Sequence, residues 1–158
     1  VQRIFYIPQG GRKTMESFVR DAPPEVKELN AIEQAYYVQH HFAKELAFLE
    51  RGKLYDIIGN VLLTHAGFES NSRDLGETSD DDFLWIRDHY EHPNKTPYIN
   101  VFGHTPTRLI HKSDDIWVSL DRKYIGIDGG CVFGGQLNGV LLTDQGEIIE
   151  TYSVKGEV

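Results

Sequence analysis

The sequence predicts an α/β fold in which helices pack on a sheet. Two observations lead to this prediction. Residues 25–51 carry apolar side chains at the spacing of an amphipathic helix, whereas residues after 53 contain short apolar runs separated by turn residues, which is typical of strands. At 158 residues the chain is long enough to bury a sizeable core. We therefore expect a single α/β domain over residues 1–158.

The first third of the chain is predicted to be helical. Thr14 is a suitable N-cap for a helix over residues 15–20, which the following pair of prolines ends. Residues 25–51 then form one long helix, or two helices end to end. Residues 2–7 read as a strand or as packed chain. Because the sequence begins at Val1 without a methionine, we expect a further piece upstream.

The remainder is predicted to be mainly strands. These are expected over residues 54–58, 60–64, 98–102, 116–120, 123–127, 137–143 and 147–154. Residues 68–79 lack periodicity and are expected to form a surface loop. Three consecutive aspartates at 80–82 favour the positive end of a helix that continues to about Tyr90 and closes before Pro93.

Charge and composition exclude several kinds of partner. The chain has 24 acidic and 16 basic residues, a formal charge of -8, which argues against a nucleic-acid or anionic-membrane partner. It contains no apolar run long enough for a bilayer and no signal-peptide pattern, so a cytoplasmic protein is expected. A single cysteine, Cys131, excludes an intramolecular disulfide, so a metal would need nitrogen and oxygen ligands.

Two histidines share one sequence context. His65 follows the apolar run 61–64, and His104 follows YINVFG at 98–103, where Pro106 prevents further strand pairing. Strand ends direct side chains into clefts, and neutral imidazole is a good ligand for Mn, Fe or Zn. The two histidines could therefore hold one ion. Each could equally be a packed or hydrogen-bonded histidine, and spacing alone does not decide between these alternatives.

The other histidines are weaker candidates. His40 and His41 are adjacent on a helix, so their side chains point roughly 100° apart and cannot share an ion on one face. His89 and His92 have the spacing of a chelating pair, but they lie at the fraying end of a helix and are expected to be solvated. His111 lies in a polar stretch and is expected to be exposed.

Arg87 and the glycine-rich segment 127–135 admit two interpretations each. The fork of donors on Arg87 matches two phosphate oxygens, but a surface arginine that covers Trp85 or pairs with Asp88 has the same local sequence. The glycine-rich segment lacks the Lys-Ser/Thr of a P-loop, so we expect a sharp turn close to a site rather than a phosphate cradle.

Four motifs in order carry a resemblance to a known family. They are THAGF at residues 64–68, FLWIRD at 83–88, VFGHTP at 101–106 and IDGGCVFGG at 127–135. Together they resemble the C-terminal half of a calcineurin-like metallophosphoesterase. The similarity is greatest to the bacterial and phage branch of the phosphoprotein phosphatases, which includes bacterial dinucleoside tetraphosphate hydrolases. The resemblance implies the C-terminal half of a β-sandwich flanked by helices in αββα layers.

The resemblance also implies roles for individual residues. His65 and His104 would bind the second of two divalent metal ions, which could be Mn, Fe or Zn, and Arg87 would grip the substrate phosphate. Residues that would line the rim of this site or support its ligands are Gly67, Gly103, Thr105, Asp128 and Cys131.

The activity implied is hydrolysis of a phosphate ester by a hydroxide held between two metal ions, without a covalent intermediate. A phosphorylated protein or a small phosphomonoester is the expected substrate. A dinucleoside polyphosphate substrate, a noncatalytic scaffold that lost half its metal site, and a structural histidine pair in an unrelated α/β protein remain alternatives. The family's Asp-x-His, Gly-Asp-x-x-Asp-Arg-Gly and Gly-Asn-His-Glu/Asp motifs do not occur in this sequence. We therefore expect an incomplete site unless an N-terminal portion accompanies the chain.

Overall fold

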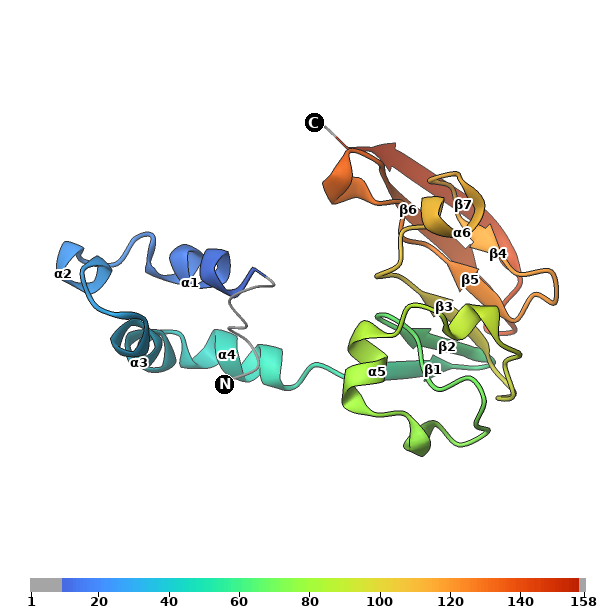
Figure 1. The fold of residues 1–158 in the computed structure, drawn as a ribbon, viewed down its shortest axis with the longest axis horizontal. Helices are drawn as coiled ribbons and strands as arrows, with labels where there is room; N and C mark the ends of the chain where they lie inside the picture. The colour runs from blue at the N-terminus through green and yellow to red at the C-terminus, as the bar shows by residue number, and fades with distance from the viewer. Residues whose placement is uncertain (1–9, 157–158) are drawn as a thin grey trace. The chain divides into compact units, whose positions relative to one another are not determined.

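The computed structural model describes residues 10–156 of the chain (Figure 1). The strand or packed chain expected over residues 2–7 lies outside the described residues. The chain divides into two compact units, Val1–Gly52 and Lys53–Val158. The single domain expected over residues 1–158 stays a prediction.

The first unit consists of helices, as the periodicity predicts. They are α1 (Gly11–Val19), α2 (Pro24–Lys27), α3 (Ala31–His41) and α4 (Ala43–Glu50). The helix α1 begins directly after Gly10, whereas the sequence predicts an N-cap at Thr14. Gly10 has a φ of 96°, which a glycine adopts without strain. The buried core of this unit consists of Val19, Ala22, Val26, Val38 and Leu46.

The prediction of one or two helices over residues 25–51 is wrong, because the segment contains three. Asn30 separates α2 from α3, since its side chain accepts hydrogen bonds from the backbone N–H groups of Ile32 and Glu33. The Glu33 side chain in turn accepts from the Asn30 N–H at 3.0 Å, which completes a capping box. Phe42 leaves helical geometry, with φ −118° and ψ 32°, and separates α3 from α4.

The second unit contains a five-stranded mixed sheet of order β1-β2-β3-β5-β4 and a separate β6–β7 hairpin. The strands are β1 (Tyr55–Ile58), β2 (Val61–Thr64), β3 (Ile99–Phe102), β4 (Trp117–Val118), β5 (Tyr124–Gly126), β6 (Gln136–Leu142) and β7 (Ile148–Lys155). Strands β2, β3 and β5 are parallel neighbours, and β1 and β4 pair antiparallel at the two edges. Each strand expected after residue 53 has a counterpart, and the α/β fold class is confirmed.

Alternating residues of the central strands build a core on each face of this sheet. One face carries Leu62, Phe102 and Tyr124, which pack with Phe68 and Phe83. The other face carries Val61, Val101 and Ile125, against which the partly buried Leu142 and Ile148 of the hairpin pack. The sheet therefore lies between a layer of helix and loop and the β6–β7 hairpin.

Short helical segments connect the strands. They are η2 (Leu75–Glu77), α5 (Asp80–Trp85), η3 (His89–Glu91), α6 (Arg108–His111) and η4 (Cys131–Phe133). The side chain of Ser79 accepts from the Asp82 N–H at 3.1 Å and caps α5. Ile86, with ψ 142°, ends this helix, so the prediction that it continues to Tyr90 is wrong. Among residues 10–156, no helix combines the length and the apolar composition needed to cross a bilayer.

Candidate functional site

Polar side chains follow three neighbouring parallel strands of the second unit. His65 comes directly after β2, His104 comes two residues after β3, and Asp128 comes two residues after β5. The Gly103 N–H donates to the His65 carbonyl at 2.9 Å, so the first two strand ends remain in register. Because ligands of open α/β sheets bind beyond the carboxyl ends of the strands, this edge is the candidate site.

The structure brings the two predicted histidines together. The ring centroids of His65 and His104 lie 5.0 Å apart, at an interplanar angle of 56°. Two imidazoles on one tetrahedral ion, with metal–nitrogen bonds of about 2.0–2.1 Å, would have centroids roughly 5 Å apart. The observed separation therefore suits a shared cation. His65 is exposed to solvent and His104 is half-buried.

His104 adopts an unusual backbone conformation. Its φ is 64°, in the left-handed region that few residues other than glycine occupy. The Thr105 N–H donates to the Gly103 carbonyl at 2.6 Å across His104, which closes a three-residue turn. Such conformations cost on the order of 1–3 kcal/mol and cluster at functional sites.

The electrostatic surroundings keep His104 neutral. Burial lowers its pKa, and the positive charge of Arg87 and the neighbouring His65 lower it further, whereas Asp128 and a hydrogen bond with the Trp85 backbone oppose the change. The Nε2 atom of His104 is buried without a hydrogen-bond partner among the described residues. A neutral ring with one nitrogen engaged by the backbone and the other unpartnered has the form of a metal-binding histidine.

Arg87 lies beside the histidine pair, in the extended segment after α5. Its Nη1 donates to the His104 carbonyl at 3.2 Å, and the side chain is exposed. The hydrogen bond fixes the guanidinium at the site and leaves further N–H donors for an anionic ligand. The expectation that Arg87 lies on a helix is wrong, because α5 ends at Trp85.

Two of the predicted rim residues are glycines that permit close approach. A Cβ at Gly103 would lie 3.6 Å from the His65 carbonyl and 4.0 Å from Cβ of Asp128, so this residue stands between two strand ends. Gly67 lies against the ring of His89, where a Cβ would overlap three ring atoms. Gly67 therefore supports the loop after His65 through a buried contact.

The other three predicted rim residues, Thr105, Asp128 and Cys131, have different surroundings. The Thr105 side chain is buried, and its Oγ1 has no hydrogen-bond partner among the described residues. Asp128 accepts from the Gly130 N–H at 2.8 Å and also faces His104 electrostatically. Cys131 lies in η4 near Gly156, where a Cβ on Gly156 would come within 2.8 Å of the Cys131 carbonyl and 3.3 Å of its Sγ.

His65 and His104 could supply part of a metal coordination shell. Within residues 10–156, no group of three or more His, Cys, Asp or Glu side chains is placed to hold an ion. His65 and His104 thus fit as two ligands of one cation. A structural or catalytic ion requires at least one further ligand from the protein, from water or from substrate.

His89 is the residue that sequence reasoning misjudged. Its place before Pro93 predicts a solvated side chain, but His89 is 1% exposed and hydrogen-bonded to Asn100. Burial lowers its pKa from 6.5 to about 4, although the Asn100 bond and the Asp88 charge act in the opposite direction. Asn100 was the available signal, because it is a polar residue inside the apolar run of β3. His111 is exposed, as expected.

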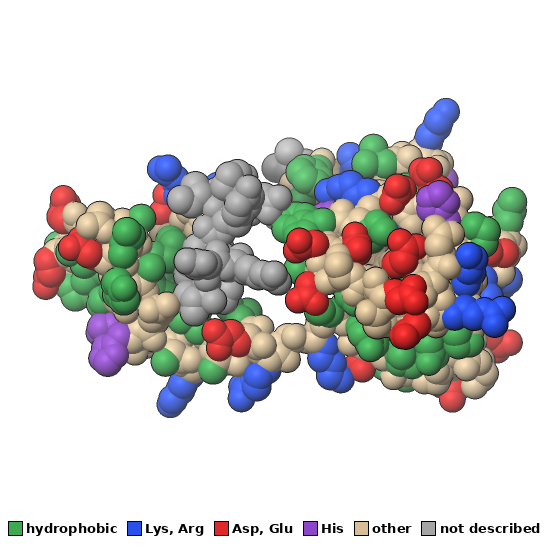
Figure 2. All heavy atoms as spheres, turned by 60° about the horizontal axis from the view of Figure 1, so that its bottom comes forward, with side chains coloured by type: hydrophobic (Ala, Val, Ile, Leu, Met, Phe, Trp, Pro, Cys, Tyr) green, Lys and Arg blue, Asp and Glu red, His purple; other side chains and the backbone are tan. Residues whose placement is uncertain are grey.

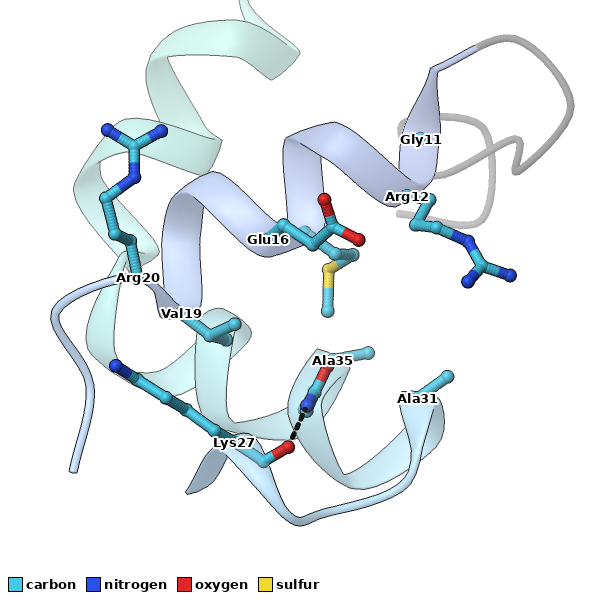
Figure 3. A pocket seen from close by; sticks show the side chains of 10 residues that line it. Gly11, Arg12, Glu16, Val19, Arg20, Lys27, Ala31 and Ala35 are labelled. Carbon is cyan, nitrogen blue, oxygen red and sulfur yellow. Dashed lines mark hydrogen bonds between the residues drawn. The ribbon is translucent and has the colours of Figure 1, made fainter. Parts of the chain in front are cut away.

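A cavity in the first unit lies apart in sequence from these residues. It has a volume of about 690 Å³ and is lined by side chains of α1, α2 and α3, with Arg12, Arg20 and Lys27 among them (Figure 3). The lining contains none of the predicted site residues, so this cavity is not the candidate site.

Comparisons with known proteins identify a similar fold. No family model matches the sequence, and no curated protein matches it either. A solved structure described as "Crystal structure of a putative diadenosine tetraphosphatase" matches with a TM-score of 0.51 and 18% sequence identity. The match covers 92% of this chain and 65% of the solved chain, so this chain spans less than two thirds of that protein's length. At this identity the likeness shows a shared fold.

Proposed function

We propose that this chain carries part of a metal-dependent phosphoesterase site. In this site His65 and His104 hold a divalent cation, and Arg87 binds the phosphate group of the substrate. The observation that carries the proposal is the 5.0 Å separation of the two imidazole rings at the ends of adjacent parallel strands. The hydrogen bond from Arg87 to the His104 carbonyl supports it, because a guanidinium beside that residue has the donors that a phosphate group requires.

The mechanism follows from the surroundings of these residues. A divalent ion, when bound, neutralises phosphate charge and lowers the pKa of a coordinated water. His104 is kept neutral by burial, so its nitrogen lone pair is available at neutral pH. The fork of Arg87 can donate to two phosphate oxygens and stabilise the negative charge that develops on them during in-line attack. The resemblance adds a second ion of the same kind, Mn, Fe or Zn.

A phosphorylated protein or a small phosphomonoester is the proposed substrate. The net charge of -8 favours neither a nucleic-acid nor a membrane partner. Figure 2 shows several acidic side chains together on one face of the second unit, which fits a protein that recruits cations. A dinucleoside polyphosphate is the second candidate substrate, since the solved chain with the similar fold is described as "a putative diadenosine tetraphosphatase".

A noncatalytic phosphate-binding scaffold is the alternative from another class. It is favoured by the finding that the described residues contain no cluster of three metal-binding side chains. Such a scaffold would retain a weak cation site and Arg87, but it would not hydrolyse a phosphate ester.

Hydrolysis assays on the intact protein, including any residues that precede Val1, separate these functions. With Mn²⁺ or Zn²⁺ present, we expect release of phosphate from p-nitrophenyl phosphate and from a phosphopeptide. We expect the Arg87→Ala variant to retain metal content and to lose about 10²–10³ in rate, because a donor to transition-state charge is removed. Preferential cleavage of diadenosine tetraphosphate would select the second substrate. Metal binding without turnover of any of the three compounds would refute the enzyme and leave the scaffold.

A further inference from the structure

A buried pair of polar side chains, His89 and Asn100, adjoins the candidate site. His89 is 1% exposed and Asn100 is 0% exposed. The His89 Nε2 and the Asn100 Oδ1 lie 3.1 Å apart. Burial of polar groups is costly unless they are hydrogen-bonded, and the low local dielectric strengthens the bonds they make. This pair therefore fixes the geometry of the two segments that it joins.

The surrounding bonds determine which atoms donate. Nδ2 of Asn100 lies 3.2 Å from the Leu62 carbonyl and 3.0 Å from Oγ1 of Thr64. Because a backbone carbonyl only accepts, Nδ2 faces β2 and Oδ1 faces His89. The amide oxygen also only accepts, so Nε2 of His89 carries the proton. Nδ1 is then unprotonated, and it is buried without a hydrogen-bond partner among the described residues.

The pair connects the two segments that carry the proposed functional residues. Thr64, which Asn100 holds, directly precedes His65. His89 lies two residues after Arg87 in the segment that follows α5. The Tyr124 hydroxyl on β5 donates to the His89 carbonyl at 3.0 Å and holds this segment against the sheet. Two hydrogen bonds in series, His89–Asn100 and Asn100–Thr64, thus join the turn after Arg87 to the strand end before His65.

We propose that His89 and Asn100 are positioning residues of the candidate site. Their hydrogen bond holds the segment that carries Arg87 in register with the strand end that carries His65. The proposal rests on the proposed function, because it assigns the pair the role of setting the separation between a cation ligand and a phosphate-binding group. Small errors in such a separation are costly to catalysis.

NMR spectroscopy of the full chain tests the connection without metal or substrate. The His89→Phe variant fills the space but removes the donor, whereas His89→Gln keeps an N–H near the position of Nε2. We expect His89→Phe to shift the backbone amide resonances of both Arg87 and His65, and His89→Gln to restore them. A folded His89→Phe protein with an unchanged His65 resonance would overturn the proposal.

A second variant covers the case in which His89→Phe does not fold. Tyr124→Phe removes the hydroxyl that lies 3.0 Å from the carbonyls of both His89 and His92, and it should shift the same two resonances. Their constancy would overturn the proposal equally. Ile125→Val is the matched control, since it loses one core methylene on the opposite face of β5 and should leave both resonances in place.

Kinetics distinguishes positioning from general weakening of the fold. With Mn²⁺ and p-nitrophenyl phosphate, His89→Phe should raise KM about 10-fold in the wild-type background, the lower end of what loss of a supporting group costs. In the Arg87→Ala background His89→Phe should not raise KM further, because the effect of His89 is transmitted through Arg87. Equal factors in both backgrounds would contradict the proposal. A different result would refute the proposed function instead. In that case His89→Phe shifts both amide resonances, but the wild-type protein neither binds metal nor hydrolyses p-nitrophenyl phosphate.

Discussion

The buried, neutral His89 makes stability depend on pH in a direction and window that can be worked out. Burial lowers its pKa from 6.5 to about 4 in the folded protein. Between these two values the unfolded chain binds more protons than the folded one. Stability is therefore fully present above pH 6.5 and is lost as the pH falls toward 4. The perturbation that isolates this effect is His89→Phe, which removes the titrating group.

The size of the effect follows from the two pKa values. Protonation linkage with a folded pKa of about 4 and an unfolded pKa of 6.5 removes about 2 kcal/mol by pH 5 and about 3 kcal/mol by pH 4. His104 also has a lowered pKa and contributes in the same direction. It is present in both proteins, so the difference between them isolates His89.

Urea unfolding at pH 7, 6, 5 and 4 measures this difference. The chain's two tryptophans, Trp85 and Trp117, both lie in the second unit, so their fluorescence reports on the unit that contains His89. We expect the variant to be less stable at pH 7, because Asn100 loses its donor, and the gap to close as the pH falls. Parallel stability curves for the two proteins down to pH 4 would refute the reasoning.

Four further substitutions test the packing and one helix cap. Gly67→Ala should cost about 1–3 kcal/mol, because its Cβ would collide with the His89 ring, whereas Gly103→Ala has room and should change the thermal midpoint little. Leu62→Ala should destabilise by about 2–5 kcal/mol in urea unfolding, because a fully buried core side chain is lost. Asn30→Ala should lower stability by about 1 kcal/mol and reduce helical circular dichroism, because the capping box of α3 is removed; unchanged ellipticity would contradict that role.

Much of the second unit could be predicted from the sequence because its signals are local. Runs of apolar residues bounded by glycine and aspartate locate the strands. The shared sequence context of His65 and His104 indicates that each histidine follows the end of a strand. Their convergence depends on β2 and β3 being parallel neighbours. That pairing joins residues far apart in the chain, and no local pattern specifies it.

The errors also have physical reasons. The end of α5 at Trp85 depends on the extended conformation of Ile86, and no proline or glycine marks that position. His89 was judged from its place before Pro93, although its burial depends on Asn100, which lies on a distant strand. The break at Asn30 was readable, since Asn followed three residues later by Glu is a capping pattern, but the apolar periodicity across it suggested continuity.

The central claim is that two strand ends present their imidazoles to one cation. Isothermal titration of the full chain with Mn²⁺ and with Zn²⁺ tests it most directly, using the wild type, a His65→Ala/His104→Ala double variant and the exposed-histidine control His111→Ala. We predict that the double variant loses at least about 10-fold in affinity, as expected when ligands are removed, and that the control binds as the wild type does. Equal affinity in the wild type and the double variant would contradict the account.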